Sequence, residues 1–330
     1  MFFGEVKTED SENFILPASI ILDEKNSKLK IKKGTIINTK LINLLLKNKI
    51  RYITCVKLED KDVDENLAVY RISEKMIDKK NSNLKLSNSR QGRCNILSKI
   101  NGLLKFDPKQ LLSVNSISDE IGIATIKPYS VVKKGQIIAS TKAIPFAINE
   151  SILQKIEKKS LKCFQILPFQ KMNVHLIQTK NKNTPIKILN KTVLVTEKRL
   201  LKLGLNNFVD KICDHNVKPL SNNIKVSVDE GADIILVFGV SAISDIRDVI
   251  PQALRDNKGN VIRLGMPVEP GNLMLLGQLK KSNKIIQFIG MPGCARSQKE
   301  NGVDWILWRM FCGLGISNED INHMGNGGLL

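Results

Sequence analysis

The chain has 330 residues, of which 42% are hydrophobic and 25% are charged, so the composition predicts a folded protein of two or three domains and excludes a disordered chain. It carries 51 Lys and Arg residues against 32 Asp and Glu, a formal net charge of +19. A charge of that size is typical of proteins that bind nucleic acids or acidic membranes.

The distribution of this charge argues against a nucleic-acid partner. Residues 231–330 hold ten Lys and Arg against nine Asp and Glu, so nearly all the excess lies in residues 1–230. Only ten of the basic residues are Arg, the side chain whose planar fork suits phosphates and bases, and aromatic residues make up 5% of the chain. We therefore expect most of the lysines to be solvated surface residues.

No targeting or membrane segment is apparent. The first residues are partly acidic and do not form a basic start followed by an apolar stretch, and the apolar run 234–240 is far shorter than the roughly 20 residues that span a bilayer. The six cysteines have neither zinc-site spacing nor the density of a disulfide framework. The sequence predicts a cytoplasmic protein with reduced thiols and no membrane partner.

Residues 1–170 predict a β-rich α+β region of one or two subdomains, without a catalytic motif of its own. In chain order we expect two extended pieces around Gly34, a helix over 41–46, a strand over 51–56, short segments between 92 and 148, and a helix over 151–158. Residues 76–90 are polar and basic, which predicts a loop or mobile linker. Gly92-Arg93 is interpreted as an ordinary turn.

Residues 171–330 alternate strands and helices, so α/β is the predicted fold class. Near-continuous apolar runs suit strands buried on both faces of a sheet. The expected strands are 174–177, 224–228, 233–238, 273–276 and 285–289; an apolar stretch at 192–195 leads into a helix over 196–203, and further helices cover 249–256 and 299–311. Fourteen of the 21 glycines lie in residues 231–330, where backbone turns tightly or approaches a ligand.

The first of three informative loops directly follows the strand 233–238. Ser241, Ser244 and the backbone amides around Gly239 could hold a phosphate. Asp245 and Asp248 could hold a divalent metal, and the alternative is that they cap the helix that starts near residue 249.

The second and third loops also precede or follow strands. Residues 265–277 predict either a rigid loop or a cradle in which Gly271 and Asn272 face a ligand. Residues 290–297 join a strand to a helix start, an arrangement that binds anions through free amides and the helix dipole. Arg296 and Ser297 add a charge and a hydroxyl there, and Cys294 is interpreted as lining.

The other polar and aromatic candidates have ordinary interpretations. The three histidines lack metal-ligand spacing, and His175, inside an apolar strand, is expected to be a core or edge residue. Trp305 and Trp308 are expected to pack. Neither a phosphate-binding Walker loop nor a dinucleotide fingerprint is present.

In order and spacing the three loops resemble those of the molybdopterin-binding domain family of molybdenum cofactor biosynthesis, which includes molybdopterin molybdenumtransferase. The segments that carry the resemblance are Gly239-Val-Ser241 with Asp245 or Asp248, Pro270-Gly271-Asn272, and Gly290-Met-Pro-Gly293-Cys-Ala-Arg296-Ser297. Residues 247–251, 266–272, 292–297 and 323–328 are most similar to the region that precedes a molybdenum cofactor cytidylyltransferase domain. The resemblance extends to Lys32-Lys-Gly34 and Lys142-Ala-Ile-Pro-Phe146.

The resemblance implies a three-layer α/β domain with a mostly parallel sheet over residues 171–330, and molybdopterin, free or adenylylated, as its ligand. Asp245 and Asp248 would be the catalytic residues and would position Mg²⁺, with molybdate as a further substrate. The implied ligand-binding residues are Gly239, Ser241, Ser244, Gly271, Asn272, Gly290, Pro292, Gly293, Arg296 and Ser297. A cytidylyltransferase is an implied partner, and the oligomeric state, including a homo-oligomer, stays open.

This chain departs from the family pattern at several positions. Phe238 replaces the first glycine of the first loop, Asn272 replaces a lysine, Cys294-Ala295 replaces Asn-Pro, and residues 179–192 offer Lys and Asn where acidic residues are expected. Two functions therefore stay open. The chain either inserts molybdenum or presents the pterin to a cytidylyltransferase, or it is a non-catalytic binding or sensing module.

Overall fold

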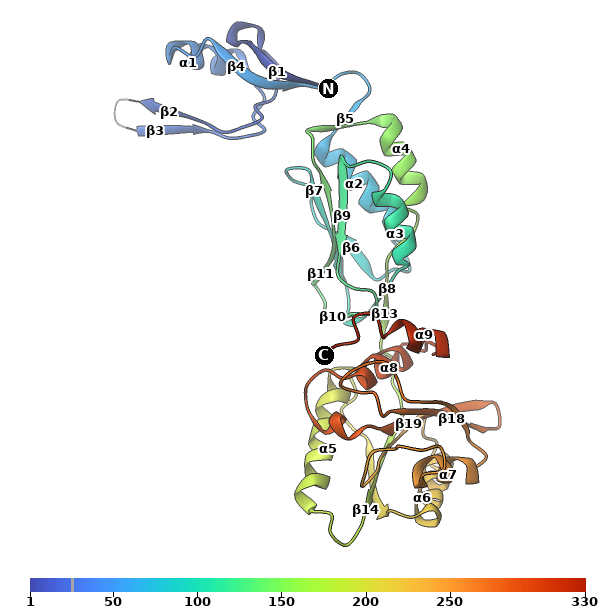
Figure 1. Ribbon diagram of the computed structural model, residues 1–330. Helices are drawn as coiled ribbons and strands as arrows, with labels where there is room; N and C mark the ends of the chain where they lie inside the picture. The colour runs from blue at the N-terminus through green and yellow to red at the C-terminus, as the bar shows by residue number, and fades with distance from the viewer. Residues whose placement is uncertain (25–26) are drawn as a thin grey trace. The chain divides into compact units, whose positions relative to one another are not determined.

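A computed structural model describes residues 1–24 and 27–330 (Figure 1). The chain divides into two compact units, Met1–Leu167 and Pro168–Leu330, whereas the sequence places the boundary at residue 170. None of the helices in the described part of the chain has the length and apolar character that crossing a bilayer requires. The described cysteines form no disulfide bond.

The first part of unit 1 is built around a small core of its own. Its elements are β1 (Phe2–Lys7), η1 (Thr8–Asp10), β2 (Ile20–Glu24), β3 (Ser27–Ile31), α1 (Thr39–Lys47) and β4 (Tyr52–Lys57). β1 pairs with β4 and β2 with β3, both antiparallel. The Asn38 side chain accepts a hydrogen bond from the Leu41 amide and so caps α1. The helix expected over 41–46 and the strand expected over 51–56 are confirmed.

The rest of unit 1 has a second hydrophobic core. Its elements are β5 (Asp62–Asp64), α2 (Glu65–Met76), β6 (Leu84–Leu86), β7 (Arg93–Ser98), β8 (Gly102–Lys105), α3 (Pro108–Asn115), β9 (Ile121–Thr125), β10 (Val131–Val132), β11 (Ile137–Ala143), β12 (Ala147–Asn149), α4 (Glu150–Lys159) and β13 (Gln165–Pro168). Antiparallel strands in the order β6-β7-β11-β9 pack against α2. The helix expected over 151–158 is confirmed as α4.

The segment 76–90 differs from the loop or mobile linker that its composition predicts. β6 lies within it and pairs with β7, and Met76, Ile77 and Leu84 are buried in the second core. Six polar residues separate the pair Met76-Ile77 from Leu84, so the stretch shows no helix or strand period, and its apolar residues are buried by others distant in the sequence.

Unit 2 is an α/β fold with a large mixed sheet. Its elements are β14 (Val174–Lys180), α5 (Ile186–Leu201), β15 (Val209–Asp214), α6 (Val217–Asp229), β16 (Ile234–Phe238), α7 (Val249–Asp256), β17 (Asn260–Leu264), β18 (Leu275–Lys281), β19 (Lys284–Met291), η2 (Gly293–Arg296), α8 (Gly302–Phe311) and α9 (Asn318–His323). The strand order is β15-β14-β16-β19-β18-β17. Strands β15, β14, β16 and β19 are parallel, and β18 is antiparallel to both of its neighbours.

Helices cover both faces of this sheet. One core joins the sheet to residues of α5, α8 and α9, and another joins it to residues of α6 and α7, which lie side by side (Figure 1). All five residues of β16 are buried, as the sequence predicts for a strand covered on both faces. Unit 2 is therefore a three-layer α/β/α arrangement.

Two expectations for unit 2 are wrong. Residues 224–228 form part of α6 and not a strand: Leu220, Ile224 and Ser227 are buried at helical spacing, whereas Val226 faces solvent. The β-branched residues in this stretch suggested a strand, but the helix period determines which of them meet the core. The apolar stretch 192–195 likewise lies inside α5, which begins earlier than expected.

Candidate functional site

The three loops identified from the sequence leave the sheet at one edge. β16 and β19 are parallel, and β17 runs in the same direction because β18 is antiparallel to both β17 and β19. The carboxyl ends of these strands therefore lie on the same side of the sheet. Residues 239–248, 265–274 and 290–301 follow β16, β17 and β19, so they meet at this side, which we call the carboxyl edge.

The strand order reverses direction at β14 and β16. The connection from β14 through α5 leads outward to β15, and the connection from β15 through α6 returns across β14 to β16. α5 and α6 lie on opposite faces of the sheet. A crevice outside the carboxyl ends of two such strands is where ligands commonly bind in open α/β sheets.

Thr179 links three strand ends at this reversal. It is the penultimate residue of β14 and is buried. Its hydroxyl lies 2.8 Å from His215 Nδ1, donates to the Phe238 carbonyl at 3.3 Å and accepts from the Val240 amide at 3.2 Å. The His215 amide in turn donates to the Lys180 carbonyl at 2.7 Å. This junction fixes the start of the first loop relative to β14 and to the turn after β15.

The sequence did not identify Thr179 or His215 as site residues. Their one visible signal is polarity at the ends of strands: Thr179 lies between Gln178 and Lys180 at the polar end of β14, and His215 follows β15 directly. The two residues are 36 positions apart, so only the parallel pairing of β14 with β15 brings them together.

Gly239 is required by close packing within the first loop. A Cβ atom there would lie 2.8 Å from the Ser241 carbonyl oxygen and 3.1 Å from Ile250 Cδ1. Ser241 and Ser244 are exposed. The first loop therefore turns sharply and presents two hydroxyls to solvent.

The two aspartates of the first loop make local contacts. Asp245 accepts hydrogen bonds from Arg247 Nε at 2.8 Å, Arg247 Nη2 at 3.1 Å and the Arg247 amide at 2.8 Å, which together lower the pKa of the Asp245 carboxyl. Asp248 is the N-cap of α7 and accepts from the Val249 amide at 2.6 Å. The helix expected over 249–256 is confirmed with those bounds.

These contacts do not fit the magnesium site that the resemblance implies. The Asp245 carboxylate is neutralised by Arg247, and one Asp248 oxygen is used by the helix cap. In the described residues, no group of three or more His, Cys, Asp or Glu side chains is placed to hold a metal ion. The residues as they lie therefore form a helix cap and a local ion pair.

Arg296 connects the third loop to the first. Its Nη2 donates to the Gly239 carbonyl at 2.9 Å, its Nε donates to Thr192 Oγ1 of α5 at 3.1 Å, and its guanidinium lies 4.7 Å from the centre of the Phe238 ring. Phe238, which replaces a glycine of the family pattern, thus supports this cation. Burial lowers the pKa of Arg296. The guanidinium joins the third loop to the first, and its positive charge lies at the carboxyl edge.

Arg199, which the sequence did not identify as a site residue, donates hydrogen bonds to the backbone of the third loop. Arg199 of α5 is buried; it donates to the carbonyls of Ala295 at 2.6 Å, Ser297 at 3.0 Å and Lys299 at 3.1 Å, and to Asp304 Oδ1 at 2.7 Å. Burial raises the pKa of Asp304, and Arg199 counteracts that rise. This ion pair fixes the backbone of the third loop on α5 and α8.

The remaining third-loop residues differ in how closely they are packed. Gly290 is tight, because a Cβ would lie 2.4 Å from Ile243 Cδ1 of the first loop. Pro292 is buried and Ser297 is exposed. Gly293 is exposed with no heavy atom within 4 Å of a Cβ position, so the backbone there is open to a ligand. Cys294 is exposed, and its sulfur accepts from Asn301 Nδ2 at 3.1 Å.

The second loop packs on the start of α8 and borders a cavity. The Gly302 amide donates to the Pro270 carbonyl at 2.9 Å, and Gly271 has φ +138° with its Cβ position 2.8 Å from the Gly302 nitrogen. Asn272 is exposed and lines a cavity of about 330 Å³. The other lining residues are Met266, Pro267, Val268, Glu269, Gly325, Gly327, Gly328, Leu329 and Leu330. The second loop and the chain's last glycine-rich segment, both part of the resemblance, therefore share this cavity.

The sequence matches no protein-family model and no curated protein. Among solved structures, the chain is similar to the tungsten cofactor synthesizing protein MoaB from Pyrococcus furiosus, with 12% identity and a TM-score of 0.29 over 42% of this chain and 91% of that one. It is also similar to a molybdenum cofactor biosynthesis protein from Pyrococcus furiosus, with 12% identity and a TM-score of 0.25 over 96% of this chain and 66% of that one.

Proposed function

We propose that unit 2 binds molybdopterin at its carboxyl edge, as part of molybdenum cofactor biosynthesis. One observation carries the proposal: three loops whose motifs resemble the molybdopterin-binding family lie at the edge where the strand order reverses, and Arg296 joins two of them through the Gly239 carbonyl. If the likeness of the three short motifs were due to chance, the three loops would not be expected to lie at the same side of the sheet.

The chemistry of the edge suits an anionic ligand. The Ser241 and Ser244 hydroxyls are exposed, the Gly293 backbone is open, and the Arg296 charge lies between the first and third loops. Hydroxyls, backbone amides and one arginine can bind a phosphate without a cluster of lysines. These residues bind and orient the ligand; no covalent step is part of the proposal.

A binding experiment tests this proposal. The purified chain is incubated with molybdopterin and separated from free ligand by gel filtration, and the bound pterin is quantified by mass spectrometry. We expect the wild type to retain pterin and the Ser241→Ala/Ser244→Ala variant to retain several-fold less, because two exposed hydroxyl donors are removed. A wild type that retains no pterin would contradict the proposal.

Two more specific functions are proposed, and the contacts of Asp245 and Asp248 favour one of them over the other. In the first, the chain inserts molybdenum into adenylylated molybdopterin or presents the pterin to a cytidylyltransferase. In the second, it is a non-catalytic binding or sensing module, which is favoured by the pairing of Asp245 with Arg247 and the capping role of Asp248. A catalytic role for Asp245 would have to compete with its contacts to Arg247, and only one oxygen of Asp248 is outside the helix cap.

Turnover distinguishes the two. The chain is incubated with adenylylated molybdopterin, Mg²⁺ and molybdate, and nucleotide release and bound molybdenum are measured over time. The binding module predicts retained pterin with neither nucleotide release nor molybdenum uptake. Catalytic release that is lost in Asp248→Asn, a variant that retains an N-cap side chain, would establish the enzyme and exclude the binding module.

A further inference from the structure

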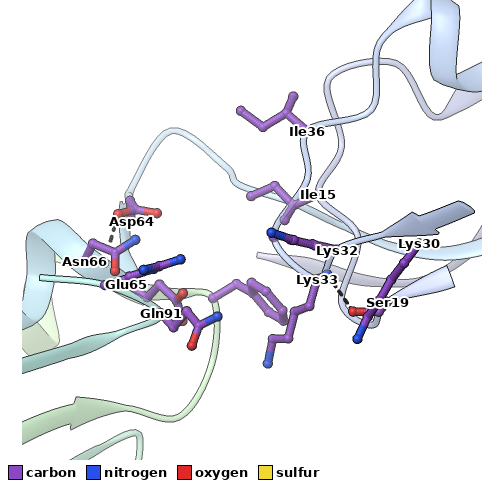
Figure 2. Close-up of a pocket in the computed structure, with 13 residues that line it drawn as sticks. Ile15, Ser19, Lys30, Lys32, Lys33, Ile36, Asp64, Glu65, Asn66 and Gln91 are labelled. Carbon is purple, nitrogen blue, oxygen red and sulfur yellow. Dashed lines mark hydrogen bonds between the residues drawn. The ribbon is translucent and has the colours of Figure 1, made fainter.

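Unit 1 contains a cavity of about 510 Å³ that brings together segments from distant parts of its sequence (Figure 2). Lys32-Lys33-Gly34 and Phe146 belong to the two stretches of the first half that share the family resemblance, and both line this cavity. Lys33 Nζ lies 4.7 Å from the centre of the Phe146 ring. None of these residues belongs to the carboxyl edge of unit 2, so pterin binding at that edge does not explain why they line one cavity.

The walls of the cavity carry an excess of positive charge. Lys32 and Lys33 extend from one wall, with Lys30 beside Ser19 on the same wall, and Glu65, Asn66 and Gln91 belong to the opposite wall (Figure 2). Arg90 is the fourth cation among the lining residues, and Asp64 and Glu65 are the two anions. Among the side chains that the structure describes, which exclude those of residues 23–27, no ion pair involves any of these four cations.

The two carboxylates of the lining make contacts within unit 1. Asp64 caps α2, because its Oδ1 accepts from the Asn66 amide at 2.8 Å and the Leu67 amide at 3.3 Å. Burial raises the pKa of Glu65, and nearby Lys142 counteracts that rise. With four cations against two carboxylates among its lining residues, the cavity carries a net positive charge.

The backbone around the cavity is held in place by specific contacts. The Glu65 amide donates to the Phe146 carbonyl at 2.9 Å, and Lys142 Nζ donates to the Gln91 carbonyl at 2.6 Å. Gly92 has φ +65°, and a Cβ there would lie 2.6 Å from Glu65 Oε2, so the turn carrying Arg90 and Gln91 packs directly on α2. The cavity also has apolar lining from Ile15, Ile36 and Phe146.

We propose that this cavity binds a phosphate-bearing organic molecule of about nucleotide size. Lys30, Lys32 and Arg90 bind its phosphate groups, and Ile15, Ile36 and Phe146 contact its uncharged part. The volume lies within the roughly 300–1,000 Å³ of small-molecule sites, and apolar lining with a few converging charges is their usual composition. The inference is independent of pterin binding in unit 2.

Calorimetric titration of the full chain at low ionic strength tests the proposal. The probes are ATP, CTP and pyrophosphate, which separate an organic phosphate from phosphate groups alone. We expect both nucleotides to bind more tightly than pyrophosphate, and Lys32→Gln/Arg90→Gln to weaken nucleotide binding by about tenfold or more, because two cations that contact phosphate are lost.

A matched variant controls for the general charge of the chain. Lys105→Gln/Lys109→Gln removes two positive charges from exposed positions of unit 1 that do not line the cavity. We expect it to leave nucleotide affinity unchanged, and both double variants to keep the wild-type thermal midpoint. Equal weakening by the two double variants, absence of nucleotide binding, or equal affinity for pyrophosphate and nucleotides would each overturn the proposal.

Discussion

The carboxyl edge of unit 2 and the cavity of unit 1 present two different ways to attract an anion. At the edge, the arginines are already bonded: Arg296 to the Gly239 carbonyl and Arg199 to the carbonyls of the third loop. In the cavity, Lys30, Lys32 and Arg90 form no ion pair with any carboxylate whose side chain the structure describes, residues 23–27 being outside that set. The net charge of the sequence therefore combines arginines that hold loops together in unit 2 with cations that line a cavity in unit 1.

This difference gives the net charge of +19 a more specific meaning. Residues 231–330 are nearly neutral, and the carboxyl edge they form depends on backbone geometry, hydroxyls and a buried ion pair. Most lysines of the first half are exposed, but a few of them converge with Arg90 on one cavity. Substitutions in unit 2 test whether the stability of the carboxyl edge depends on its own hydrogen bonds, ion pair and close packing.

The largest effect is expected from Arg199→Ala. The substitution leaves Asp304 buried without its partner and removes the donors to three carbonyls of the third loop, so unit 2 should lose about 3–5 kcal/mol of stability. Urea unfolding, with hydrogen exchange read separately for peptides of each unit, measures the loss. Lys198→Ala, an exposed neighbour on α5, is the control and should cost little. A loss below about 1 kcal/mol would show that the ion pair does not hold the loop.

The next effect concerns the glycines of the second and third loops. Gly271→Ala should destabilise unit 2 by about 1–3 kcal/mol, because its φ is +138° and the new Cβ would lie 2.8 Å from the Gly302 nitrogen. Gly293→Ala has no neighbour within 4 Å and should change stability by less than about 0.5 kcal/mol. Thermal unfolding of the two variants checks the contrast, which equal destabilisation would refute.

A smaller effect is expected at Asp248. Asp248→Ala should cost about 1 kcal/mol, because the side chain that accepts from the Val249 amide is lost, whereas Asp248→Asn keeps a good N-cap residue and should cost clearly less. Comparing urea unfolding of both variants with their pterin retention separates the capping role from a ligand role. Equal stability of wild type and Asp248→Ala would exclude the cap.

The smallest expected effect is a pH dependence of the stability of unit 2, which arises from His175 near the amino-terminal end of β14. His175 is buried, its Nδ1 makes no hydrogen bond with the described residues, and Glu230 Oε2 lies 3.6 Å away. Burial, and then Lys211, lower the pKa of His175, while Glu230 opposes them. The unfolded state therefore binds a proton at higher pH than the folded state, so unit 2 loses stability as pH falls below about 6.5.

The His175→Leu variant isolates this contribution. Below pH 6.5 the wild type should lose up to about 1.4 kcal/mol per pH unit more than the variant, the limit for one proton. Urea unfolding between pH 7 and pH 5 measures both slopes. Parallel slopes would show that His175 does not titrate between the folded and unfolded states.

Local signals predicted much of unit 2 correctly. The strand β16 was predictable from a continuous apolar run bounded by glycines, and α7 from Asp248 before the helix and Pro251 in its first turn. β15 was missed because it is an edge strand with largely polar residues, and only Cys213 of it is buried. In α6, β-branched residues favoured a strand, but packing against the sheet favours the helix.

The candidate site was predicted in its loops but not in its supports. The three loops that follow β16, β17 and β19 were identified from their local motifs and spacing. Thr179, His215 and Arg199 act through partners 36 to 105 positions away, so their roles depend on strand order and on which face α5 covers. Before the fold is known, a basic residue such as Arg199 cannot be distinguished from a solvated one.

The central claim, that molybdopterin binds at the carboxyl edge, is tested most directly by blocking that edge without unfolding it. Gly293→Leu places a bulky side chain at an open position of the third loop, and Gly315→Leu makes the same change at an exposed, uncrowded position beyond the far end of α8. Mass spectrometry of the purified proteins, after incubation with molybdopterin, measures the bound pterin. We predict pterin in the wild type and in Gly315→Leu and its loss in Gly293→Leu; equal pterin in all three would contradict the account.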